Sequence, residues 1–137
     1  MVKTTIEYTG ELHCIATHGP SGVRIDTDAP VDNHGRGESF SPTDLVAAAL
    51  GTCMATIMGI NAQRLNLELT GMKIEVQKEM TTSAPRRIAR LSTEIWLPIP
   101  ASADPSKSLE KAALTCPVFY SVNPEIEKPV IFHYAAE

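Results

Sequence analysis

The stretch from Ser41 to Asn61 constrains the fold more than any other part of the chain. Ser41 can cap the free backbone N–H groups of a helix, Pro42 suits its first position, and Asp44 stands three residues after the cap. No charged residue occurs from Leu45 to Ile60. Because a helix that is apolar on every side belongs inside a core, the sequence predicts a long buried helix that the rest of the chain surrounds.

The same apolar run could instead be a membrane span. A span needs about 20 consecutive apolar residues, and the run from Leu45 to Ile60 is shorter than that. It is also diluted by Gly51, Thr52, Thr56 and Gly59. We therefore expect a core helix and no membrane segment.

Length and composition are those of an ordinary globular protein. The 137 residues suit a single domain covering residues 1–137, and 43% of them are hydrophobic and 20% charged. A net charge of −4 argues against a general nucleic-acid binder. The first ten residues lack the apolar core of a signal peptide, and the three cysteines lack the regular spacing of a disulfide framework. We expect a cytoplasmic protein in which a cysteine pair would change redox state rather than cross-link the fold.

The rest of the chain predicts an α+β fold built on antiparallel sheets. Alternating or β-prone runs predict six strands, and the last two before the second helix form a long hairpin with one solvated face. The second helix starts at Asp104 and reaches about Thr115. The loop over residues 28–40 leads into the long helix and should bring Arg36 and Glu38 near its start. The expected strands cover residues 3–9, 12–17, 23–27, 69–81 and 88–98, and a final strand covers residues 129–134.

Cys53 lies in the middle of the long helix, where its simplest role is that of a small core residue. A mid-helix position gives a thiolate none of the help that a helix N-terminus provides. If Cys53 is reactive, a cation must come from elsewhere in the chain. Arg24 and Arg36 are the candidates, because both precede the helix in a strand or loop.

Cys116 stands directly before Pro117, and this position allows two interpretations. Pro117 disfavours helical geometry at Cys116, so the second helix should break or kink there. If Pro117 opens a new helical turn, Cys116 is its N-cap, and nearby N–H groups would favour the thiolate. Alternatively, Cys116 only ends a helix on its buried side.

Cys14 is expected to be structural. It lies in a predicted strand near His13 and His18, but this spacing lacks the four-ligand pattern of a zinc site. The remaining histidines, His34 and His133, are scattered along the chain. We therefore expect no metal, and the sequence contains no glycine-rich phosphate loop or nucleophile elbow.

The two larger motifs together resemble the OsmC/Ohr family, the osmotically inducible and organic-hydroperoxide-resistance proteins. The motifs are PTDLVAAALGTC, which ends at Cys53, and TCPVFYS, which contains Cys116. In that family, a segment similar to the first opens a buried helix and carries the first cysteine, and a segment similar to the second carries the second cysteine. The order of the predicted elements fits as well, so the resemblance covers nearly the whole chain.

The resemblance implies an OsmC-like fold, an intertwined homodimer with its active site at the subunit interface, and thiol-dependent reduction of organic hydroperoxides. It assigns Cys53 as the peroxidatic thiol and Cys116 as the resolving thiol. An external dithiol would restore the pair after each turnover. No metal, flavin or haem is implied.

The sequence departs from the family pattern where the family carries an acid, ten residues before the first cysteine. That position is Thr43 here. The adjacent Asp44 should lie on the opposite face of the helix from Cys53, because successive residues are about 100° apart. Glu38 in the loop is a freer substitute. The family's arginine could be either Arg24 or Arg36.

This departure keeps other functions open. The main alternative is a non-enzymatic protein on the same scaffold that binds a small apolar ligand at a dimer interface. A general disulfide oxidoreductase ranks last, because the chain has no Cys-x-x-Cys motif.

Overall fold

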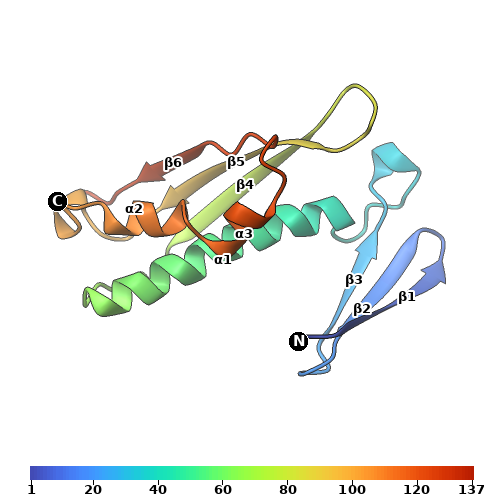
Figure 1. The fold of residues 1–137 in the computed structure, drawn as a ribbon, viewed down its shortest axis with the longest axis horizontal. Helices are drawn as coiled ribbons and strands as arrows, with labels where there is room; N and C mark the ends of the chain where they lie inside the picture. Colours follow the sequence, from blue (N-terminus) through green and yellow to red (C-terminus); the bar gives the residue numbers. More distant parts are fainter. The chain divides into compact units, whose positions relative to one another are not determined.

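The computed structural model describes residues 1–137, which form two compact units, Met1–Val46 and Ala47–Glu137. Each unit contains a three-stranded sheet, and the long helix α1 (Pro42–Arg64) begins in the first unit and continues into the second (Figure 1). The mixed α+β class predicted from the sequence is confirmed. The single-domain assignment stays a prediction.

The N-terminal unit is an antiparallel sheet with the order β1-β2-β3. The strands are β1 (Thr4–Gly10), β2 (His13–His18) and β3 (Arg24–Asp28), within one residue of the predicted starts and ends. Between β1 and β2 the chain turns through Gly10, Glu11 and Leu12, all with positive φ. After β3, a loop over residues 29–40 contains one short 3₁₀ turn, Val31–Asn33.

The start of α1 is capped as the sequence predicts. The Ser41 Oγ accepts a hydrogen bond of 3.1 Å from the Asp44 N–H, and the Asp44 carboxylate accepts one of 2.9 Å from the Ser41 N–H. This reciprocal arrangement is a capping box, which satisfies two N–H groups that would otherwise lack partners. Asp44 therefore has a structural role at the helix start.

The C-terminal unit is built on the hairpin of β4 (Lys73–Met80) and β5 (Ile88–Trp96), which pair in antiparallel register. On β5 the buried residues alternate with partly exposed ones, and the buried set is Ile88, Leu91, Thr93 and Ile95. The predicted hairpin with one solvated face is confirmed, although β4 starts at Lys73 rather than at Leu69.

The last strand, β6 (Val130–His133), pairs with β5 in parallel. The expectation of purely antiparallel sheets was therefore wrong for this edge. A parallel pair needs a long crossover, because the chain must return to the same end of the sheet. The segment between β5 and β6 supplies it through α2 (Ser108–Ala113) and α3 (Pro117–Ser121).

One face of the β4-β5-β6 sheet is covered by helices (Figure 1). The residues of α1 that are buried are Ala47, Leu50, Gly51, Met54, Met58 and Ala62. Gly51 allows the close approach, because a Cβ there would lie 3.1 Å from the Val76 Cγ2 and 3.5 Å from the Ile74 Cγ2 of β4. The helix packs on the hairpin through small and flexible residues.

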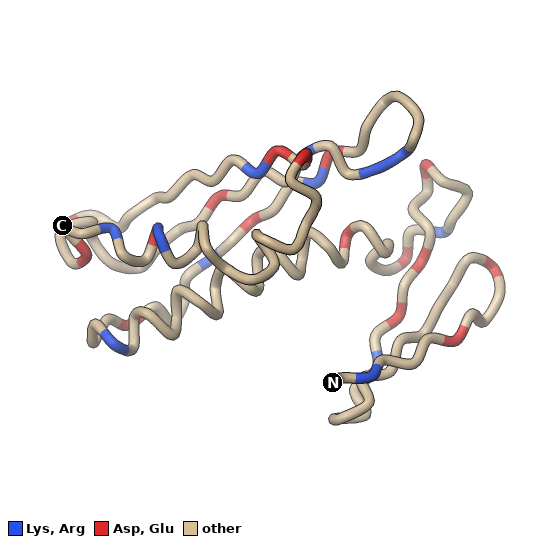
Figure 2. Tube along the Cα trace, viewed as in Figure 1, with Lys and Arg blue, Asp and Glu red and all other residues tan.

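The other side of α1 is not buried within the chain, contrary to the expectation of a helix enclosed on every side. Ile60 is 52% exposed, and Thr52 and Thr56 are exposed as well. No charged residue lies between Asp44 and Arg64, so this side is nearly uncharged (Figure 2). The sequence pattern predicts burial correctly for one side of α1 only, because a single chain has too few helices and strands to cover both sides of the helix.

The length and hydropathy of α1 would also allow it to cross a membrane. A single helix of this kind is weak evidence for a span, since core helices share these properties. The packing of α1 against β4 is typical of a core helix.

The observed helix α2 is shorter than the predicted one, which ran from Asp104 to about Thr115, and it is followed by the separate short helix α3. Lys107 adopts a left-handed conformation with φ 56°, and α2 begins only after it. The buried Asp104 accepts hydrogen bonds from the N–H groups of Ser108 (3.2 Å) and Leu109 (2.8 Å). These bonds compensate the cost of burying the carboxylate and lower its pKa below the ordinary value, although burial itself opposes the shift.

Replacing Gly51 should test the contact of α1 with β4. We expect Gly51→Leu to lower the free energy of unfolding by about 1–3 kcal/mol, because the larger side chain would overlap the side chain of Val76. Gly59 is the matched control, since a Cβ there meets nothing within 4 Å. Urea unfolding should show that Gly59→Leu changes stability by no more than about 0.5 kcal/mol; equal losses at both positions would contradict the packing described above.

Candidate functional site

Cys53 lies on α1 at the border between its buried and open sides. The preceding residue, Thr52, is exposed, the following one, Met54, is buried, and Cys53 itself is partly exposed. Within the single chain, Cys53 is therefore accessible from the open side of the helix. The neighbouring side chains of the helix carry no charge.

Cys116 is placed by the break that Pro117 introduces after α2. Pro117 occupies the first position of α3, and Cys116 is the N-cap with extended backbone geometry. Its Sγ accepts a hydrogen bond of 3.4 Å from the Phe119 N–H. The predicted N-cap position is confirmed, and the side chain is also completely buried.

The two cysteines lie near each other. Cys53 is one of the neighbours that raise the pKa of the Cys116 thiol, although the two residues come from distant parts of the chain. Both are free thiols in the structure. A helix and a capped turn thus bring together the two cysteines that the sequence singles out.

Burial decides the acid–base properties of Cys116. Burial raises the pKa of the Cys116 thiol, and the neighbouring Cys53 raises it further, while the N–H groups of Phe119 and Val118 act in the opposite direction. The thiolate that an N-cap position would favour is therefore not the preferred form of Cys116. Cys116 is therefore an N-cap, as one of the two interpretations of the sequence predicted, but burial outweighs the effect of that position on the pKa of Cys116.

The three other predicted site residues, Arg24, Arg36 and Glu38, belong to the N-terminal unit. Arg36 forms an ion pair of 2.5 Å with Glu11. Arg24 is exposed on β3 and has no ion-pair partner in the chain. Glu38 is anchored through its backbone, because its N–H donates to the Asp28 carboxylate at 3.1 Å.

Comparison with known proteins identifies the fold and the family. A family model for OsmC-like proteins matches residues 35–128. The chain belongs to the OsmC-like family. A protein from Psychrobacter arcticus 273-4, named for osmotic stress induction and a detoxification response, shares 41% sequence identity, with a TM-score of 0.89 over 97% of this chain and 96% of that one.

More distant OsmC-like structures share the fold alone. The organic hydroperoxide resistance protein OsmC from Legionella pneumophila has a TM-score of 0.78 at 11% identity, covering 97% of this chain and 96% of that one. The organic hydroperoxide resistance protein OhrB of Bacillus subtilis has a TM-score of 0.69 at 17% identity, covering 96% and 97%. No curated protein matches the chain significantly.

Thr43 occupies the position where the resemblance to the family leads us to expect an acid. The Thr43 Oγ1 lies 3.2 Å from the Ser41 Oγ, within the capped first turn of α1. A neutral hydroxyl group therefore occupies this position and supports the helix start. Asp44 is not a substitute, because the capping box engages its carboxylate.

One buried cluster of the OsmC-like chain, around Asp28 of β3, is not apparent from the sequence. Asp28 is 3% exposed, and its Oδ1 lies 2.6 Å from the His13 Nδ1. The hydrogen bond from His13 lowers the pKa of Asp28, and the Glu38 N–H acts in the same direction. This cluster ties the loop over residues 29–40 to the N-terminal sheet. Only the cross-strand pairing of His13 with Asp28 could have suggested it.

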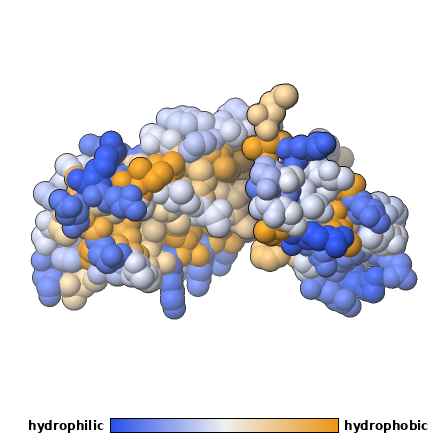
Figure 3. Space-filling model, turned by 90° about the horizontal axis from the view of Figure 1, so that it is seen from below, coloured by the Kyte–Doolittle hydropathy of each residue, from blue (hydrophilic) through white to orange (hydrophobic).

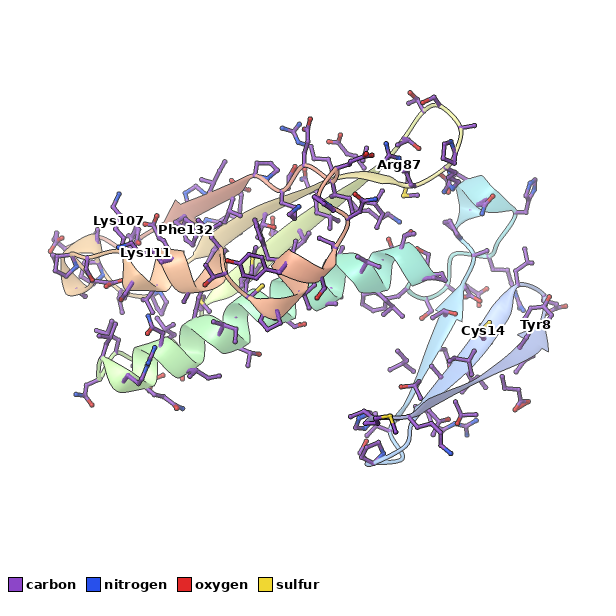
Figure 4. All side chains as sticks on the ribbon, viewed as in Figure 1. Tyr8, Cys14, Arg87, Lys107, Lys111 and Phe132 are labelled. Atoms are coloured by element: carbon purple, nitrogen blue, oxygen red, sulfur yellow. The ribbon has the colours of Figure 1, made fainter.

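Cys14 takes no part in the thiol pair. It lies on β2, opposite Tyr8 of β1, and both residues are labelled in Figure 4. The neighbouring histidines have other partners, since His13 contacts Asp28 and the His18 Nδ1 lies 2.6 Å from the Ser21 Oγ. No group of metal-ligating side chains therefore forms around Cys14. Its structural role stays a prediction.

The burial of Cys116 predicts unequal labelling of the three thiols. We expect iodoacetamide to modify Cys53 and Cys14 before Cys116, because Cys116 is fully buried and its raised pKa keeps it protonated. Peptide mass spectrometry at successive times should give the three rates. Labelling in urea is the control, since unfolding should make the rates similar; fast native labelling of Cys116 would contradict its burial.

Proposed function

We propose that the protein is a thiol-dependent peroxidase that reduces organic hydroperoxides, with inorganic peroxide as a possible further substrate. The observation that carries the proposal is the closeness of the Cys53 and Cys116 thiols in the C-terminal unit, where Cys53 raises the pKa of Cys116. Membership of the OsmC-like family and the hydroperoxide-resistance names of its structural relatives agree with it.

The proposed oxidative half of the reaction has two steps. The Cys53 thiolate attacks the terminal peroxide oxygen, which gives a Cys53 sulfenic acid and an alkoxide that takes up a proton to become an alcohol. The Cys116 thiol then attacks the Cys53 sulfur, a disulfide forms, and the sulfenic oxygen leaves as water. An external dithiol reduces the disulfide and closes the cycle.

Burial supports this assignment of roles. Cys53 is the sulfur that a peroxide can reach, because it is partly exposed while Cys116 is fully buried. The raised pKa of Cys116 makes it a poor first nucleophile. The uncharged side chains of α1 around Cys53 suit an alkyl hydroperoxide better than a charged substrate.

A cation is needed near the reacting thiolate and peroxide, and Arg24 and Arg36 remain the candidates. The lack of an ion-pair partner favours Arg24, since Arg36 is already paired with Glu11. Glu38 is the proposed acid that orients the arginine in the absence of an acid at position 43. Comparing Arg24→Gln with Arg36→Gln should decide the role, because only the supporting arginine should slow the oxidation of Cys53, by about tenfold or more.

We also propose a homodimer in which a second copy covers the open side of α1. Apolar surface remains exposed on the chain in the view of Figure 3. On α1 this surface includes Ile60, and on the N-terminal sheet it includes Ile6, Tyr8 and Ile25. Exposed apolar side chains in such number are typical of surfaces that a partner covers.

Exposure to one equivalent of cumene hydroperoxide tests the enzyme function directly. We expect the peroxide to be consumed and a Cys53–Cys116 disulfide to appear in the peptide mass spectrum, because the two thiols lie near each other. Cys53→Ser should abolish both results. Cys116→Ser should still consume one equivalent but accumulate oxidised Cys53. Unconsumed peroxide with two free thiols would reject the peroxidase.

Two matched isoleucines test the dimer. We expect Ile60→Lys to raise the dimer dissociation constant by about tenfold or more, because it places a charge on the open side of α1. Ile131→Lys is the control, since Ile131 on β6 is 53% exposed and Ile60 is 52% exposed. Sedimentation velocity should show monomers for the first variant only; a monomeric wild-type protein would rule out the dimer.

A non-enzymatic ligand-binding protein is the second candidate, and Thr43 in place of the family acid is the observation that favours it. The C-terminal unit also has a cavity of about 340 Å³ beside the end of α1. It is lined in part by Ala55, Gly59 and Met72 and not by Cys53. Native mass spectrometry of protein purified from cells should reveal a retained apolar ligand, whereas a ligand-free protein that turns over peroxide would exclude this function.

A further inference from the structure

The short helix α3 needs support from outside itself. It has five residues and buries none of them. A helix of this length is not stable alone in water, because forming its first turn costs more than its few hydrogen bonds return. Its N-cap is nevertheless the fully buried Cys116, whose Sγ accepts a hydrogen bond of 3.4 Å from the Phe119 N–H. Whatever holds α3 in place therefore also holds the Cys116 sulfur.

The Phe119 ring is where α3 meets another part of the chain. Its neighbour Tyr120 lies edge-on to it, with ring centroids 6.5 Å apart, but Tyr120 belongs to the same helix and is 71% exposed. Lys128, from the segment before β6, places its Nζ over the Phe119 ring, 5.1 Å from the centroid. A cation within about 6 Å of a ring centroid is attracted to the ring face. Lys128 therefore contacts α3 from outside the helix.

Lys128 is itself held in place. Its Nζ donates a hydrogen bond of 3.0 Å to the carbonyl of Ile126, which is buried. The backbone on both sides of Lys128 is bonded to β5, because N–H groups of that strand donate to the carbonyls of Glu127 (2.8 Å) and Pro129 (2.9 Å). A residue fixed to the sheet thus contacts the ring of α3.

We propose that Lys128 is a positioning residue of the thiol pair, which ties α3 to β5 through the Phe119 ring and so keeps the Cys116 sulfur buried near Cys53. The tie itself is a property of the fold. Its consequence for catalysis rests on the proposed peroxidase function, and Lys128 acts there only through Phe119.

The consequence concerns the lifetime of the Cys53 sulfenic acid. The disulfide needs the two sulfurs to approach to about 2.05 Å, so its rate depends on how well Cys116 is held in line. When α3 loosens, a second hydroperoxide can react first. The Cys53 sulfenate sulfur bonds to the terminal peroxide oxygen, the O–O bond breaks, and the alkoxide takes up the sulfenic proton to become an alcohol. Cys53 is left as a sulfinic acid, which thiols do not reduce.

Iodoacetamide labelling of Cys116 in the reduced protein tests the tie without peroxide. We expect Lys128→Met to raise the labelling rate by about two- to fivefold, because the side chain keeps its length but loses the attraction to the ring. Lys128→Arg retains the cation and should restore the wild-type rate. Lys111→Met is the control, since Lys111 is an exposed lysine of α2 (Figure 4). An unchanged rate in Lys128→Met would overturn the inference.

Low concentrations of urea distinguish local from global opening. Loosening of α3 exposes little surface, so the labelling rate in Lys128→Met should rise only slightly with urea. A rate that rises as steeply as global unfolding would overturn the inference, because it would mean that Lys128 stabilises the whole unit rather than α3.

Phe119→Leu tests the route of the effect, since it removes the ring but keeps an apolar side chain and the N–H. We expect it to raise the labelling rate of Cys116 by the same factor as Lys128→Met. The double variant should label no faster than either single variant, because both changes break one contact. Factors that multiply in the double variant would show that Lys128 does not act through the ring.

The pH dependence of labelling separates position from charge. A direct effect of the Lys128 charge on the sulfur would mean that Lys128→Met raises the pKa of Cys116 and slows labelling. The proposed tie predicts the opposite sign, with faster labelling at each pH and an unchanged pH midpoint. A raised midpoint with slower labelling would overturn the inference.

Excess cumene hydroperoxide tests the consequence for catalysis. We expect Lys128→Met to accumulate Cys53 sulfinic acid at a peroxide concentration about two- to fivefold lower than the wild-type protein, and Lys128→Arg to match the wild type. Equal accumulation in all three proteins would overturn this consequence. Altered Cys116 labelling in a protein that does not consume peroxide would reject the proposed function alone, and peroxide turnover with unaltered labelling would reject the tie alone.

Discussion

The closeness of the Cys53 and Cys116 thiols depends on two packing constraints within the C-terminal unit. Gly51 lets α1 lie close to Val76 of β4, which fixes the side of the helix on which Cys53 stands. Pro117 ends the course of α2 and starts α3, which turns the Cys116 sulfur inward as the N-cap. Neither residue touches a substrate, yet together they bring two distant cysteines to one place.

Burial gives the two sulfurs different properties. Cys116 is enclosed, its pKa is raised, and its sulfur is held by the Phe119 N–H. Cys53 is the one that meets molecules from outside. An asymmetric pair of this kind suits a cycle in which one thiol reacts first and the other forms and later releases the disulfide. In the proposed cycle, this asymmetry directs the peroxide to Cys53.

In the N-terminal unit, the buried Asp28 carboxylate forms hydrogen bonds with the His13 side chain and the Glu38 N–H. These bonds fix the loop that carries Arg36 to the sheet of the same unit. The open, uncharged side of α1 and the exposed apolar residues of the N-terminal sheet are surfaces that a single chain leaves uncovered. A second copy of the chain is the simplest cover for them, and the proposed homodimer follows from that need.

The sequence by itself determined the local features. Ser41, Pro42 and Asp44 define the start of α1, the alternation along β5 defines its buried face, and Pro117 defines the turn at Cys116, because each depends on neighbouring residues only. The two cysteine motifs also pointed to the OsmC-like family. Long-range packing decided the rest. Only the tertiary structure showed that β6 runs parallel to β5, that one side of α1 stays open, and that burial outweighs the N-cap in the pKa of Cys116, since each depends on residues far apart in the chain.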